Sequence, residues 1–133
     1  MKKIVISASA AFQKDIQKYR TQLMQKGYKV INYPKPIKPK NLEKEYPKIH
    51  TDYYMSIVNA DILLILNLKK KGIANYIGGS VFAEMAFAIG LKIAKNKFIQ
   101  VYCLNPLPKN LVYSDELARW KKLGWIKLWK KIK

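Results

Sequence analysis

Residues 75–90 read NYIGGSVFAEMAFAIG. Gly78 and Gly79 allow a tight turn or a close approach to a ligand, because glycine accepts a positive φ without a Cβ clash. Ser80 is a favoured N-cap residue, so we expect a helix to begin there and to run to about residue 95. Its residues are apolar on nearly every side, which is typical of a helix buried against a sheet.

Glu84 is the one acidic residue of this apolar helix. A capping box does not explain it, because the box needs a spacing of three positions and Ser80 lies four before Glu84. An interaction with the helix dipole or with a buried lysine would explain it structurally. The functional alternative is a carboxylate in a cleft at the helix start, acting as a nucleophile or a general base.

Short apolar runs alternate with helical patterns along the rest of the chain. The pattern predicts further helices at residues 12–26, 49–59 and 115–123, the last of them capped by Ser114. The proline-rich residues 34–47 are predicted as a surface loop or flap with one short helix. Strands are predicted at residues 3–7, 28–32, 62–66, 97–104 and, as an edge strand, 124–129. This alternation indicates one α/β domain over residues 1–133, a three-layer sandwich with a mostly parallel, five-stranded, doubly wound sheet of the flavodoxin or Rossmann type.

In such sheets, ligands bind beyond the carboxyl ends of the strands. Ser7 and Ser9 follow the first strand and could donate hydrogen bonds to a phosphate. Neither a dinucleotide fingerprint nor a P-loop is present. Tyr76 could stack on a base or pack against the flap, and Asp61 could cap a turn or orient a catalytic group.

Composition limits the chemistry. The single cysteine, Cys103, lies in an apolar run and is expected in the core, while the single histidine, His50, argues against a histidine metal site or a Ser-His triad. We therefore expect no metal and no cofactor. No apolar run is long enough to cross a bilayer and no signal-peptide pattern begins the chain, so a cytoplasmic protein without a membrane partner is expected.

The net charge of +18 favours anionic partners, although lysine enrichment across a whole lineage explains it equally well. Nucleic acid is a less favoured partner than a small molecule. Three tryptophans alternate with lysines near the C-terminus and could form a stacking surface for bases, but packing in the core or at a subunit interface is the stronger interpretation. They are Trp120, Trp125 and Trp129.

Two segments suggest a family. Residues 59–66, NADILLIL, and residues 82–88, FAEMAFA, are separated by a glycine loop and resemble the core of the nucleoside 2-deoxyribosyltransferase-like superfamily. That superfamily includes nucleoside transferases and deoxynucleoside-monophosphate N-glycosidases, and the resemblance covers residues 3–104. It implies that Glu84 attacks C1′ of the sugar of a nucleoside or nucleotide, releases the base and forms a glycosyl ester.

The resemblance also implies a homodimer or larger homo-oligomer, in which a loop after the fourth strand reaches the neighbouring site. Residues expected to line the substrate pocket are Ser7, Ser9, Phe12, Asp61, Tyr76, Gly78, Gly79, Ser80 and, from that loop, Asn110.

The chain differs from the transferases at three positions. Gly78 stands where they carry an aspartate, Ile6 where they carry a tyrosine, and Tyr53 where they carry a further aspartate. A nucleotide-binding module that kept the cleft without the chemistry is therefore the alternative function.

Overall fold

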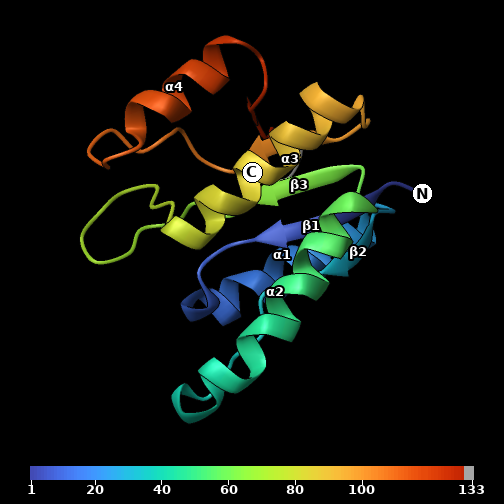
Figure 1. The fold of residues 1–133 in the computed structure, drawn as a ribbon, viewed down its shortest axis with the longest axis vertical. Helices are drawn as coiled ribbons and strands as arrows, with labels where there is room; N and C mark the ends of the chain where they lie inside the picture. The colour runs from blue at the N-terminus through green and yellow to red at the C-terminus, as the bar shows by residue number, and fades with distance from the viewer. Residues whose placement is uncertain (131–133) are drawn as a thin grey trace.

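The computed structural model describes residues 1–130 and contains one five-stranded sheet (Figure 1). Its strands are β1 (Lys3–Ser7), β2 (Lys29–Asn32), β3 (Ile62–Ile65), β4 (Gln100–Cys103) and β5 (Lys127–Leu128). Their order is β2-β1-β3-β4-β5, and every neighbouring pair is parallel. The doubly wound α/β prediction is confirmed, and β5 lies at the edge of the sheet as expected.

Four α-helices cover the sheet: α1 (Gln13–Gln25), α2 (Leu42–Val58), α3 (Gly79–Lys95) and α4 (Ser114–Lys122). Short 3-10 helices, Ala10–Phe12 and Pro39–Asn41, precede α1 and α2. One face packs against α1, where Ile16 and Leu23 meet Ile4 and Ile6 of β1. The other face packs against α2, α3 and α4, so the domain has three layers.

The central strands β1 and β3 are buried on both faces. Residues 4–6 and 62–66 are therefore continuous apolar runs without alternation, which is typical of parallel strands covered on both sides. Each such side chain contributes about 1.5–3 kcal/mol when it leaves water. This burial holds the carboxyl ends of β1 and β3 side by side.

The helix α2 differs from the prediction. Residues 34–47 are not all flap, because one helix begins at Leu42 and continues through Pro47 to Val58. Pro47 lacks an N–H group, so the carbonyl of Glu43 loses its helical partner. Glu43 is exposed, so water can donate a hydrogen bond to its free carbonyl.

Two predicted N-caps are also wrong. Gly78 rather than Ser80 is the N-cap of α3, and Ser80 is its second residue. A Cβ atom at Gly78 would lie 3.2 Å from Cε2 of Tyr76, so the packed tyrosine ring favours glycine at this turn. The last helix also begins differently from the prediction: Tyr113 is the N-cap of α4, and the Ser114 hydroxyl accepts from the Leu111 N–H at 2.9 Å instead.

Two asparagines join the ends of β3 and β4. The fully buried Asn67 donates from Nδ2 to the carbonyls of Asn105, at 2.9 Å, and Pro106, at 3.1 Å. Asn105 returns two bonds, from its backbone N–H to Asn67 Oδ1 at 2.9 Å and from Nδ2 to the Asn67 carbonyl at 3.1 Å. The pair fixes two loops at the carboxyl edge of the sheet.

We expect the substitution Asn67→Ala to lower the free energy of unfolding by about 2–4 kcal/mol, because it removes three hydrogen bonds and leaves buried partners unsatisfied. Urea denaturation measures the change. Asn110→Ala, at an exposed position with no recorded hydrogen bond, is the control. Equal midpoints for the two variants would contradict the structural role of the pair.

Candidate functional site

A cleft of about 630 Å³ opens at the carboxyl ends of β1 and β2. Its walls are the loops after β1, β2 and β3, the start of α3, and one face of α2. The first turns of α2 project beyond the sheet, on the side where β1 and β3 end (Figure 1). The predicted site residues that line the cleft are Ser9, Tyr76, Gly78, Gly79, Ser80 and Glu84.

Ser7 holds one oxygen of the Glu84 carboxyl group. The Ser7 hydroxyl, fully buried at the end of β1, donates a hydrogen bond to Glu84 Oε1. Within residues 1–130, no donor forms a hydrogen bond to the other carboxylate oxygen, Oε2. Ser7 is therefore a support beneath the cleft rather than part of its lining.

No cation among the described residues forms an ion pair with Glu84. Within residues 1–130 the one ion pair is Lys48–Asp52, at 2.7 Å on the surface of α2. The first turn of α3 contains no acid, and Glu84 lies beyond it, where the helix dipole has little effect. Neither structural explanation for this carboxylate, a buried lysine or the helix dipole, finds support among the described residues.

Burial raises the pKa of Glu84 from 4.5 to about 7, and the hydrogen bond from Ser7 opposes this rise. The cause is the loss of water around the ionised form. Burial also raises the pKa of Tyr53 and Tyr54 on α2, and the negative charge of Glu84 adds to both shifts. A carboxyl group with a pKa near neutrality in a cleft is typical of catalytic sites.

Two tyrosines brace the surroundings of Glu84. The hydroxyl of the buried Tyr53 donates to the carbonyl of Ile6, and the hydroxyl of Tyr113 donates to the carbonyl of Ile77. The second bond fixes the peptide that precedes Gly78, so the turn into α3 is held from the α4 side. The Tyr53 hydroxyl is thus engaged with the backbone.

A lysine enters the cleft from the loop after β3. Lys70 Nζ donates to Ser9 Oγ at 2.7 Å and lies 5.6 Å from the centroid of the Tyr76 ring. Its neighbours Lys69 and Lys71 are exposed. The sequence shows three consecutive lysines and does not distinguish among them. In the folded chain an antiparallel bridge joins Lys70 to Ile73, and this turn directs the Lys70 side chain into the cleft.

Three predicted site residues lie away from the cleft. Phe12 packs in the cluster between α1 and the sheet. Asp61 precedes β3 at the opposite edge of the sheet, where Oδ2 accepts from the Lys3 N–H at 2.8 Å. Asn110 is exposed in the loop between β4 and α4.

The α2 wall was missed by sequence reasoning. The residues on it share one helical face and include several rings and two acids of the cleft: Leu42, Glu45, Tyr46, Ile49, His50, Asp52 and Tyr53. Their spacing is that of one face of a helix, which would have been visible had residues 42–58 been treated as one helix. Pro47 concealed it.

The tryptophans belong to the core. Trp120 stacks on Phe82, with ring centroids 5.1 Å apart, and Tyr113 stacks on Phe82 at 4.4 Å. Trp129 is buried and Trp125 packs against the core, so the interpretation as core residues is confirmed. These rings do not form an open surface for bases.

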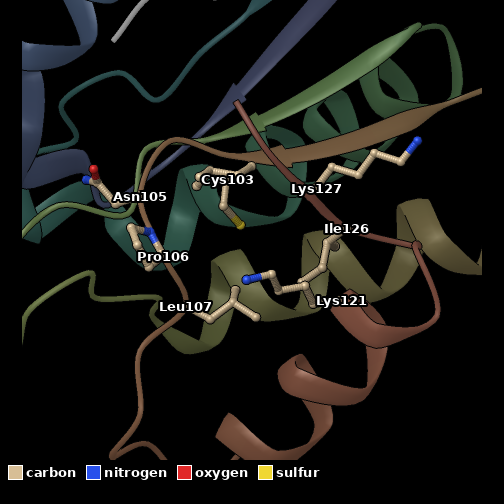
Figure 2. Close-up of a pocket in the computed structure, with 8 residues that line it drawn as sticks. Cys103, Asn105, Pro106, Leu107, Lys121, Ile126 and Lys127 are labelled. Carbon is tan, nitrogen blue, oxygen red and sulfur yellow. The ribbon is translucent and has the colours of Figure 1, made fainter. Parts of the chain in front are cut away.

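A second, much smaller pocket lies between β4 and α4 (Figure 2). Cys103, Leu107 and Lys121 line it, and its volume of about 10 Å³ leaves room for roughly one water molecule. Burial raises the pKa of the Cys103 thiol to about 12. Cys103 is a core residue, as predicted.

Residues 1–130 contain no group of three histidine, cysteine, aspartate or glutamate side chains that could hold a metal ion. Over the same residues, no helix combines the length and the apolarity needed to span a bilayer. Neither a scan against known protein families nor a search of curated proteins finds a match to this chain.

Proposed function

We propose that the protein breaks the N-glycosidic bond of a nucleoside or nucleotide, by hydrolysis or by transfer to a second base, with Glu84 as the nucleophile. The observation that carries the proposal is a carboxylate at the cleft, held on one oxygen by Ser7 and forming no ion pair within residues 1–130. The likeness of residues 59–66 and 82–88 to the nucleoside 2-deoxyribosyltransferase-like superfamily supports the same chemistry.

The reaction follows the general retaining scheme. Glu84 Oε2 attacks C1′ of the sugar, the bond from C1′ to the base nitrogen breaks, and its electron pair leaves with the base. A neutral base takes up a proton as it leaves. Water, which loses a proton to solvent, or a second base then attacks C1′ from the opposite side, and the ester electron pair returns to Glu84. Ser7 fixes Oε1, so the attacking oxygen keeps one orientation through both steps.

Lys70 and the start of α3 suit an anionic group on the substrate. The ammonium group of Lys70 and the free N–H groups at the beginning of α3 lie on the same cleft as Glu84. Gly79 brings that backbone to the cleft without a side chain. A 5′-phosphate would therefore lie here, with the sugar over Glu84 and the base towards α2.

The proposal is tested by trapping the intermediate. Incubation with a slow 2′-fluorinated nucleotide analogue should add the mass of the sugar phosphate to the protein, and peptide mapping should place it on Glu84. The adduct should be absent from Glu84→Gln. Recovery of an intact bound nucleotide, with no adduct at any time, would instead support a nucleotide-binding module.

We expect Lys70→Met to raise KM for nucleoside 5′-monophosphates by about tenfold or more, because it removes a charge-assisted hydrogen bond worth about 1.5–3 kcal/mol. The KM for the matching nucleosides, which lack the phosphate, should change little. Lys69→Met removes the same charge from the exposed neighbour and is the control. An equal rise in KM for nucleosides and nucleotides would contradict a phosphate contact.

A further inference from the structure

The α2 wall of the cleft carries a ladder of stacked rings. Tyr46 stacks on His50 with ring centroids 5.2 Å apart, His50 packs on Tyr54 in a tilted arrangement at 4.4 Å, and Tyr54 stacks on Phe87 of α3 at 4.5 Å. Tyr46 and His50 line the cleft, and 44% of the Tyr46 surface is exposed. The outer end of the ladder thus offers an aromatic surface beside the site of the proposed nucleophile.

The cleft is also the place where the acids of this basic protein gather. Glu45, Asp52 and Glu84 line it, which is three of the eight acids in the chain. Lys35 and Lys70 are the lysines that line it, out of 26 basic residues in the chain. Asp52 is already paired with Lys48, so the aromatic faces act together with Glu45 and Glu84. They favour a positively charged ring, through cation–π attraction and direct charge attraction.

Two of the hydroxyl groups near Glu84 already donate their protons. The Ser7 proton is donated to Glu84 itself, and the Tyr53 proton to the carbonyl of Ile6. Asp52 accepts from Lys48. A neutral base needs a proton as it departs, whereas a base that is cationic at its glycosidic linkage departs as a neutral molecule and needs none.

We propose, building on the function above, that the preferred substrates are nucleotides whose base carries a fixed positive charge, such as N-ribosylpyridinium or N7-alkylated purine nucleotides. Glu84 Oε2 forms a bond to C1′, the C1′–N bond breaks, and its electron pair neutralises the cationic ring. Water then adds to C1′ and loses a proton to solvent, and the ester electron pair returns to Glu84. The cationic ring stacks on Tyr46 and the phosphate contacts Lys70.

The experiment compares substrates that differ in this charge. One pair is 7-methylguanosine 5′-monophosphate and guanosine 5′-monophosphate, and the other is nicotinamide mononucleotide and its 1,4-dihydro form. Base release is followed by chromatography, and rates with Glu84→Gln are subtracted as background. Because leaving-group protonation is worth about 10²–10⁴-fold, the cationic member of each pair should react at least about 100-fold faster.

The failures of the two proposals are distinguishable. Glu84-dependent release of neutral and cationic bases at similar rates would overturn the charge preference and leave the glycosidase activity supported. His50, which lines the cleft, would then be the candidate acid that protonates the leaving base. Release from none of the four compounds would overturn the charge preference, and the absence of a Glu84 adduct in the trapping experiment would overturn the glycosidase as well. Release confined to the cationic members supports both.

A binding measurement tests the aromatic wall without turnover. Using Glu84→Gln protein, the affinity for the methylated guanosine nucleotide should exceed that for the unmethylated one, and Tyr46→Leu should reduce this preference by about 2–5-fold. Tyr46 is exposed, so the substitution leaves the core intact. Equal affinities for the two nucleotides would overturn the assignment of the ring to this wall.

Discussion

Glu84→Gln should abolish base release from every nucleotide that the wild-type protein cleaves, with a loss of at least about 10³-fold in kcat. Glutamine has nearly the same shape and can still accept the hydrogen bond from Ser7, but its amide cannot form the glycosyl ester. Substrate binding should survive, because the cleft walls and Lys70 are unchanged. Chromatographic rates and equilibrium binding, measured on the same preparation, separate the two effects.

Glu43→Gln is the matched control. It makes the same chemical change at an exposed position of α2 that does not line the cleft, and it should retain wild-type activity. Wild-type and Glu84→Gln rates that agree across all substrates would remove the nucleophile. Tight binding without release by either protein would favour the nucleotide-binding module.

The stability of the wild-type protein should contain a component that falls as pH rises, and Glu84→Gln should remove it. The folded pKa of Glu84 is about 7 and the unfolded value is near 4.5, so the folded state holds the proton more tightly. The protonated carboxyl group is tolerated at low pH, and stability is lost progressively from about pH 4.5 to pH 7. A shift of this size corresponds to about 3 kcal/mol.

The measurement is urea denaturation of both proteins between pH 4.5 and pH 8.5. The free-energy difference, Glu84→Gln minus wild type, should increase by about 3 kcal/mol over this interval and then level off. The groups around Glu84 are the Ser7 hydroxyl from β1 and the phenols of Tyr53 and Tyr54 from α2, whose raised pKa values keep them neutral throughout. A difference that stays constant with pH would mean that Glu84 is ionised normally in the folded protein.

Much of the fold could be predicted because it follows from local sequence patterns. The unbroken apolar runs at residues 4–6 and 62–66 indicated strands buried on both faces, and the apolar helix after Gly79 indicated a helix covered by the sheet and its neighbours. Connections between parallel strands require helices, so the layer arrangement followed. The error at α2 arose because Pro47 usually ends a helix, yet it is tolerated here near an exposed helix start.

The candidate site was predictable in part. Ser9, Tyr76 and the Gly78–Ser80 segment lie at strand ends or at the helix start, where the topology directs ligands, and they line the cleft. Asp61 is adjacent to the central strand β3, but it precedes the strand rather than following it. It therefore lies at the edge of the sheet opposite to the cleft. Lys70 was indistinguishable from its neighbours until the loop geometry turned it towards Ser9.

Sequence periodicity and composition were sufficient for the α/β architecture, the edge carrying the cleft, and the one acid worth testing. They were sufficient because strand and helix patterns repeat over a few residues, and a charge in an apolar helix stands out locally. The contact between Ser7 and Glu84, the absence of a neutralising cation and the ring ladder on α2 required the folded chain. These features join residues as many as 77 positions apart in the sequence. Burial raises the pKa of Glu84, and no local sequence pattern measures burial.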